Sequence, residues 1–224
     1  MKDRYGREID YLRISITDRC NLRCIYCMPE EGICQTAHKE ILTYDEIRRI
    51  CRCMTALGIK KIKLTGGEPL TRKGSAVLVR MLKELPGIEK VTLTTNGILL
   101  KEQMAELAEA GIDNINISLD TLNTEAFKKI TRREGLARVL EGLKEAMKYP
   151  QIGLKINCVP VLEDPENLIN LAGIARDNPI HVRFIEMMPI GYGKEFRFCG
   201  EDEICSVLEG AYGEMTPITE KYGN

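Results

Sequence analysis

Three cysteines lie close together near the start of the chain, in the segment TDRCNLRCIYCMPE at residues 17–30. Cys20, Cys24 and Cys27 follow one another at spacings of four and three residues. Buried thiols usually occur singly as small apolar groups, so a cluster of three indicates metal binding or redox chemistry. The segment is therefore the first place in this chain to look for a reactive site.

Three chemistries compete for this triplet. Structural zinc takes four ligands, but only one C-x2-C pair is present here, and His38 and His181 lack ligand-like spacing. A thioredoxin-type C-x-x-C pair would leave Cys20 without a role. An iron–sulfur cube normally takes four thiolates, so three would leave one iron open to a small molecule. The open cluster is favoured, and the other two chemistries remain as alternatives.

The elements that must position these thiols alternate between strand-like and helix-like segments. Strands are predicted at residues 11–17, 61–65, 90–95, 114–120, 153–159 and 181–187. Helices are predicted at about 43–57, 73–85, 100–110, 123–148 and 165–176. Crossovers of this length join parallel strands, so the pattern predicts successive βαβ units in an α/β domain.

Within each strand, apolar and polar residues alternate with a period of two. A doubly wound sheet or an ordinary barrel lumen would be apolar on the second face as well. The alternation instead predicts a partial, open (β/α)6 TIM-like barrel with a polar lumen, in which the cations Arg13, Lys63, Lys155 and Arg183 favour an anionic ligand. An antiparallel sheet with one solvent face is the alternative, which the intervening helices disfavour.

Composition narrows the class further. The 224 residues fit one barrel domain. With 32 Lys+Arg against 33 Asp+Glu, the chain has no net positive charge that would attract nucleic acid or an anionic membrane. Residues 1–10 contain no apolar stretch typical of a secretory signal, and no apolar run is long enough for a membrane span. Nine cysteines in such a chain predict reduced thiols and a cytoplasmic location.

The C-x3-C-x2-C spacing after the first strand, with Tyr26 before the last cysteine, resembles the radical S-adenosylmethionine (SAM) superfamily. TGGEP at residues 65–69, after the second strand, is similar to that family's glycine-rich turn. The resemblance implies a [4Fe–4S] cluster whose open iron binds SAM and whose electron cleaves SAM to a 5′-deoxyadenosyl radical. It assigns the cluster to the three cysteines and assigns contacts with SAM to Tyr26, Gly66, Gly67, Glu68, Ser118 and Met188.

Longer strings, among them KLTGGEPLTRK (63–73), NINISLDTL (114–122) and RFIEMMP (183–189), resemble the GTP 3′,8-cyclase branch of molybdenum cofactor biosynthesis. That resemblance implies a lyase that abstracts the ribose 3′ hydrogen of GTP and joins C3′ to C8, in partnership with a flavodoxin- or ferredoxin-type reductant and in a possible homodimer. It assigns contacts with GTP to Arg13, Lys63, Thr94, Lys155 and Arg183.

Two departures from the branch affect this expectation. Lys63 stands where the branch usually has arginine, which keeps the charge but loses the planar fork. The branch also has a second cysteine triplet for a second cluster, which this sequence does not reproduce. We therefore expect a radical SAM barrel at 1–190 and, at 191–224, the start of a truncated C-terminal extension, with incomplete activity. The alternatives are a radical SAM enzyme acting on a peptide or another small molecule, and a non-catalytic iron–sulfur fragment.

Overall fold

Six parallel strands form one open sheet in the computed structural model, which describes residues 2–161, 164–197 and 199–218. The strand order follows the sequence from β1 to β6, and every neighbouring pair is parallel. The strands are β1 (Tyr11–Ser15), β2 (Lys61–Thr65), β3 (Lys90–Thr95), β4 (Asn114–Ser118), β5 (Gly153–Cys158) and β6 (Ile180–Phe184). The predicted partial barrel of parallel strands is thus confirmed, although β1, β4 and β6 end two or three residues earlier than expected.

The helices that precede β6 connect successive strands, and one further helix follows β6. They are α1 (Tyr44–Ala56), α2 (Ser75–Lys83), α3 (Leu100–Glu109), α4 (Thr124–Thr131), α5 (Leu136–Ala146), α6 (Pro165–Asp177) and α7 (Glu201–Tyr212). Helix α1 begins with a capping box, in which the Glu46 amide donates to Thr43 Oγ1 (3.3 Å) and the Thr43 amide donates to Glu46 Oε2 (2.7 Å). Among the described helices, none is both long and apolar enough to cross a bilayer.

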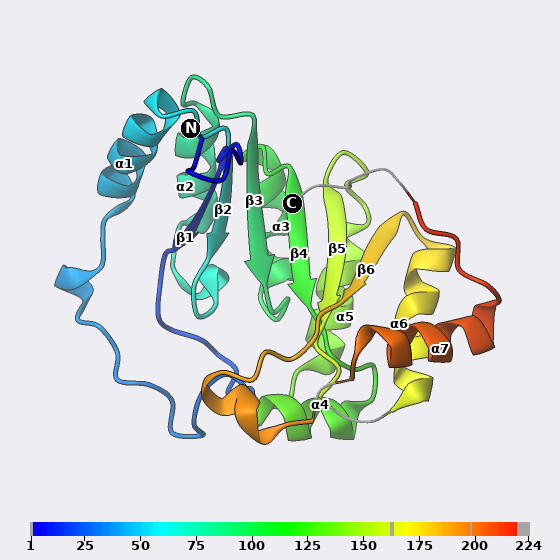
Figure 1. Cartoon of the computed structure of the whole chain (residues 1–224). Coiled ribbons are helices and arrows are strands. Elements are labelled where there is room, and N and C mark those ends of the chain that lie inside the picture. The colour runs from blue at the N-terminus through cyan, green and yellow to red at the C-terminus, as the bar shows by residue number, and fades with distance from the viewer. Residues whose placement is uncertain (1, 162–163, 198, 219–224) are drawn as a thin grey trace.

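The core lies between the helices and one face of the sheet. Figure 1 shows α2, α3 and α5 behind the sheet, and the carboxyl ends of all six strands point toward the bottom of that view. Residues of the apolar strand face, including Leu64, Leu93, Ile117 and Ile156, have no exposed surface. Along each strand, side chains therefore point alternately into the core and into the lumen.

The predicted helix 123–148 is wrong, because two shorter helices occupy this stretch. Helix α4 ends at Thr131, and the capping residue Arg132 that follows has a φ of 53° in the left-handed region. That conformation costs a non-glycine residue about 1–2 kcal/mol. Gly135 has a φ of 150° and lies so close to Ile98 that a Cβ would come within 2.4 Å of Ile98 Cδ1. The chain turns between these two residues before α5 begins.

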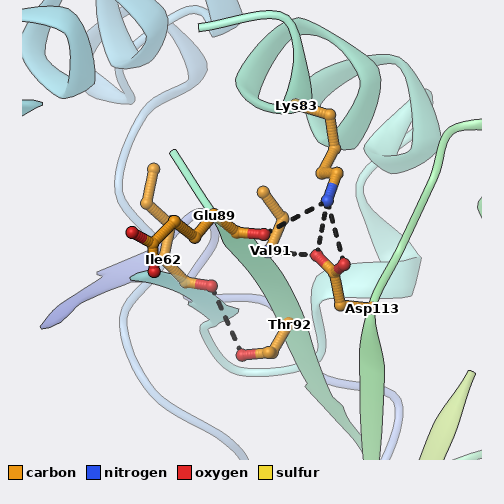
Figure 2. Close-up of polar contacts among 6 residues, drawn as sticks. All are labelled: Ile62, Lys83, Glu89, Val91, Thr92 and Asp113. Atoms are coloured by element: carbon orange, nitrogen blue, oxygen red, sulfur yellow. Dashed lines mark hydrogen bonds and ion pairs between the residues drawn. The ribbon is translucent and has the colours of Figure 1, made fainter. Parts of the chain in front are cut away.

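Asp113, at the start of β4, connects that strand to β3 and α2. Its carboxylate accepts hydrogen bonds from Lys83 Nζ (2.8 Å) and from the Val91 amide (2.6 Å), as Figure 2 shows. In the same view, Thr92 Oγ1 on the lumen face donates to the Ile62 carbonyl of β2 (3.3 Å). These contacts fix the amino ends of the central strands, opposite the rim that carries the cysteines.

Candidate active site

The cysteine loop begins directly after β1 and lies at the carboxyl rim of the sheet. Cys20 and Cys24 are partly buried and pack against the core, whereas Cys27 is exposed, and all three thiols are free. The Cys27 amide donates to the Cys24 carbonyl (2.9 Å), which folds these two residues into a turn. The structure therefore places the three predicted ligands in one loop at the rim.

Two N–H groups point at the Cys20 sulfur. The Leu22 amide lies 3.4 Å from Sγ, and the Asn96 side-chain Nδ2 lies 3.9 Å from it. Such donors favour a thiolate, the form that binds metal, although burial and, to a smaller extent, the charge of Glu68 raise the pKa of Cys20. The environment of this sulfur fits a cluster ligand.

The donors in the rim loop are three thiols, and each must be tested as a metal ligand by its chemistry. Over residues 2–161, 164–197 and 199–218, no three Cys, His, Asp or Glu side chains converge tightly enough to hold one metal ion. The ligands of structural zinc must meet around one centre, whereas each thiolate of an iron–sulfur cube binds a different iron. Three free thiols in one rim loop are a set of donors that an iron–sulfur cluster takes.

Helix α4 supports the loop through its carboxyl end. The Arg23 amide donates to the Thr131 carbonyl and the Ile25 amide to the Ile130 carbonyl, both at 2.9 Å. The last carbonyls of a helix have no partner within that helix, so the loop satisfies two of them. Sequence reasoning missed this support because it treated α4 and α5 as one helix.

The glycine-rich turn after β2 packs against the residues that precede Cys20. The Gly67 amide donates to the Thr17 carbonyl and the Glu68 amide to the Arg19 carbonyl, both at 2.7 Å. A Cβ at Gly66 would lie 2.4 Å from the Thr17 oxygen, and one at Gly67 would lie 2.4 Å from the Arg19 oxygen. Only glycine fits at these two positions, since real Cβ atoms do not approach backbone oxygens so closely.

The Glu68 side chain is buried and joins the turn to the end of β3. Its carboxylate accepts hydrogen bonds from Thr95 Oγ1 (2.7 Å) and from the amides of Asn96 (2.6 Å) and Leu70 (3.0 Å). Burial raises the pKa of Glu68, while these three donors favour its charged form. These contacts are all within the protein, so a role of Glu68 toward SAM stays a prediction.

A small pocket at the rim brings together Cys24, Tyr26 and Ser118. The Tyr26 hydroxyl donates to Asp120 Oδ2 (2.7 Å), and the Val159 amide donates to Asp120 Oδ1 (2.8 Å). Burial raises the pKa of Asp120 to about 6. Asp120 was missed by sequence reasoning, and its position two residues after Ser118, at the carboxyl end of β4, is the signal that could have indicated it.

Met188 lies outside this pocket. Its side chain is 65% exposed, on the segment that follows β6, whereas the neighbouring Met187 is buried. The assignment of Met188 to SAM therefore remains a prediction that these contacts do not bring into the site.

The lumen face gathers four cations on four strands. Arg13 pairs in register with Lys63, and Asn157 of β5 pairs with Arg183 of β6. Lys63 is 4% exposed, and its pKa falls to about 8 because of burial and the charges of Arg13, Arg183 and Lys155. Strand register and the two-residue alternation put these four residues on the same face of the sheet.

Uncharged polar residues occupy the same face. Thr94 pairs with Asn116, which pairs in turn with Lys155. The Lys63 ammonium lies 5.9 Å from the centre of the Tyr11 ring, a cation–π contact at the outer limit of the useful range. Among the described residues, the charges that act on Lys63 are those of Arg13, Arg183 and Lys155, all of them cations.

Fold and rim together define a class: an open parallel α/β barrel with a thiol triplet suited to an iron–sulfur cluster and a cationic lumen. The chain belongs to the radical SAM superfamily, whose family model matches residues 14–173. The resemblance read from the cysteine spacing and the TGGEP turn is thereby confirmed.

The chain is also similar to curated GTP 3′,8-cyclases. It is 43% identical to the one from Pelotomaculum thermopropionicum over an alignment of 227 residues that covers 100% of this chain and 70% of that protein. It is 49% identical over 192 residues to the one from Petrotoga mobilis, covering 85% of this chain and 59% of that protein. The chain thus spans between about three fifths and seven tenths of the length of these relatives.

A solved structure shares the fold. The crystal structure of Streptococcus suis SuiB bound to S-adenosylmethionine matches with a TM-score of 0.64 and 24% identity, over 78% of this chain and 38% of that chain. At this identity the likeness supports the partial barrel and nothing finer.

Proposed function

We propose that the chain is the barrel of a GTP 3′,8-cyclase, with Cys20, Cys24 and Cys27 as the three ligands of a [4Fe–4S] cluster whose fourth iron binds SAM. Superfamily membership and the free thiols at the rim support the cluster. When bound, the reduced cluster would supply one electron for the cleavage of SAM, which starts radical chemistry. The protein must hold the cofactor at the rim and present the substrate from the lumen.

On the SAM side, Tyr26 and Ser118 line the rim pocket with Cys24, and Gly66 and Gly67 pack directly against the backbone that precedes Cys20. We assign these residues to SAM, with Met188 entering only if the segment after β6 moves inward. Glu68 then contributes to SAM binding by fixing the glycine-rich turn to the end of β3. Backbone exposed at a glycine turn can approach a ligand closely, which supports this arrangement.

On the substrate side, the observation that carries the proposal is the buried, unbalanced charge at Lys63. Burying a cation without a carboxylate is costly unless an anion completes the site. A triphosphate supplies several negative charges, and Arg13, Lys63, Lys155 and Arg183 can bind its oxygens through charge-assisted hydrogen bonds. Thr94 offers a hydroxyl on the same face. GTP is the substrate named in the relatives.

The test is anaerobic reconstitution of the chain with iron and sulfide, followed by dithionite and SAM. We expect one [4Fe–4S] cluster, release of methionine and 5′-deoxyadenosine, and loss of the cluster in the Cys24→Ala variant. Product analysis with GTP then tests the substrate. Zinc in place of iron, or a cluster that survives Cys24→Ala, would refute the cluster assignment.

The substrate assay compares wild type with Lys63→Met, which removes the buried cation of β2, and with the control Lys61→Met, which removes a half-buried lysine from the same strand. SAM cleavage that responds to a peptide or another small molecule, and not to GTP, would transfer the proposal to a different radical SAM reaction. Iron retained without any binding of SAM would favour a non-catalytic iron–sulfur fragment.

We further propose a flavodoxin- or ferredoxin-type reductant, a homodimer and a cytoplasmic location. We likewise propose a boundary between a barrel at 1–190 and an extension at 191–224. Helix α7 of that extension contacts α6, where the Tyr212 hydroxyl donates to the Ile169 carbonyl (2.7 Å). Size-exclusion chromatography of the reconstituted protein tests the dimer, and electron transfer from each reduced carrier tests the reductant.

A further inference from the structure

Arg132 has an unusual backbone conformation at the end of α4. Among the described residues it is the only non-glycine residue with a positive φ, at 53°. Glycine is the residue that normally occupies such a position after a helix. An arginine held in this conformation indicates that its side chain makes contacts that compensate for the strain.

Those contacts are with the cysteine loop. One guanidinium nitrogen of Arg132 donates to the Met28 carbonyl (3.0 Å) and to the Arg23 carbonyl (3.2 Å). Arg23 immediately precedes Cys24, and Met28 immediately follows Cys27. A single nitrogen thus joins the two ends of the segment that carries the second and third thiols, across a sequence separation of more than a hundred residues.

The neighbouring residues fix Arg132 in turn. The carbonyls of Ile130 and Thr131 accept the loop amides described above, and Thr131 Oγ1 donates to the Phe127 carbonyl (2.8 Å). The carboxyl end of α4 therefore supplies two acceptors and one cationic donor to the same loop. The adjacent Arg133 differs, because it is exposed and its guanidinium donates to the carbonyl of its own neighbour Arg132 (2.7 Å) rather than to the loop.

We propose that Arg132 is a positioning residue for the cluster: it fixes the separation of Cys24 and Cys27 so that their thiolates bind two irons of one cube. This inference rests on the proposed cluster at the three cysteines. The left-handed conformation directly after α4 places this guanidinium against the loop.

The test compares wild type with Arg132→Gly, Arg132→Lys and the control Arg133→Ala. Glycine adopts a φ of 53° freely, so Arg132→Gly removes the guanidinium without disturbing the end of α4. After anaerobic reconstitution, we would measure iron content, the rate of cluster loss to a ferrous chelator, the EPR spectrum of the reduced cluster, and the melting temperature of the cluster-free protein.

We expect Arg132→Gly to melt at or above the wild-type temperature without the cluster. With the cluster, it should lose iron about tenfold faster, equivalent to about 1.4 kcal/mol, and give a broadened EPR spectrum. Arg132→Lys, whose amine lacks the guanidinium geometry, should also lose iron faster than wild type, and Arg133→Ala should match wild type.

Loss of iron at the wild-type rate in both Arg132 variants would overturn the inference. So would equal acceleration in Arg133→Ala, which would indicate a general effect of charge. If Arg132→Gly fails to fold, Arg132→Lys decides between the same two outcomes. If wild type takes up no cluster, the proposed function fails and the inference fails with it, a result distinct from a stable cluster that is indifferent to Arg132.

Discussion

Replacing Lys63 by methionine should stabilise the fold while weakening the binding of anions. The Lys63 ammonium is buried on the lumen face, where its charged neighbours Arg13, Lys155 and Arg183 are cations as well. Methionine has a similar length and no charge, so it fills the space without the desolvation and repulsion. Removing this charge should therefore raise the free energy of unfolding of the protein without its ligand.

The magnitude follows from the pKa. Burial and the neighbouring cations lower the pKa of Lys63 from 10.5 to about 8. At about 1.4 kcal/mol for each pKa unit, the buried charge costs on the order of 3 kcal/mol at pH 7. Loss of the contact with the Tyr11 ring at 5.9 Å offsets about 0.5–1 kcal/mol of this. The net gain in the free energy of unfolding should be about 2–3 kcal/mol.

The gain must depend on pH in a defined direction. Between about pH 8 and 10.5 the unfolded chain keeps the Lys63 proton and the folded chain releases it, so wild-type stability rises with pH in this window. The advantage of Lys63→Met is therefore fully present below about pH 8 and disappears toward pH 10.5. Urea unfolding of the cluster-free protein at pH 7, 9 and 10.5 measures it.

The matched control is Lys61→Met on the same strand, where the lysine pairs with Asp10 at 2.9 Å near the surface. That variant should change stability by no more than about 1 kcal/mol. A Lys63→Met protein less stable than wild type at pH 7, or a gain that does not vary with pH, would refute the reasoning. Stabilisation of wild type by GTP, absent in Lys63→Met, would connect the charge to the ligand.

Three further changes test the rim and the sheet. Gly67→Ala places a Cβ 2.4 Å from the Arg19 oxygen and should lower the free energy of unfolding by about 1–3 kcal/mol, measured in urea, with loss of the turn's contact to the loop. Asp120→Asn removes a buried charge and weakens the bond to Tyr26, so SAM should bind about tenfold more weakly by calorimetry while the fold is not destabilised; unchanged affinity would contradict a role for this pair. Asp113→Ala leaves a strand amide without its acceptor and should cost about 1–3 kcal/mol in urea unfolding, and a neutral result would show that water replaces the carboxylate.

The sheet could be predicted because its information is local. Alternating residues such as Lys63 and Leu64 differ in chemistry at every step, and helices of sufficient length separate the strands. The capping box at Thr43 and Glu46 likewise lies within four residues. Patterns of this kind depend on neighbouring positions, so they can be recognised without knowledge of tertiary contacts.

The contacts that shape the rim could not be predicted in the same way. Tyr26 and Asp120 are 94 residues apart in the sequence, and an aspartate after a strand also suits an ordinary turn. The left-handed conformation of Arg132 has no signal in residue type, so α4 and α5 read as one helix. Glu68 was recognised as part of a motif, but its three internal hydrogen bonds emerged only from the fold.

The alternation along the strands has a consequence for how such a protein can change. Leu64 and Ile117 face the core, whereas Lys63 and Ser118, their neighbours in the chain, face the lumen. Substitutions on the lumen side can therefore accumulate without repacking the interior that holds the sheet together. New substrates are accessible to this scaffold through changes at every second residue, while the apolar half of each strand preserves the barrel.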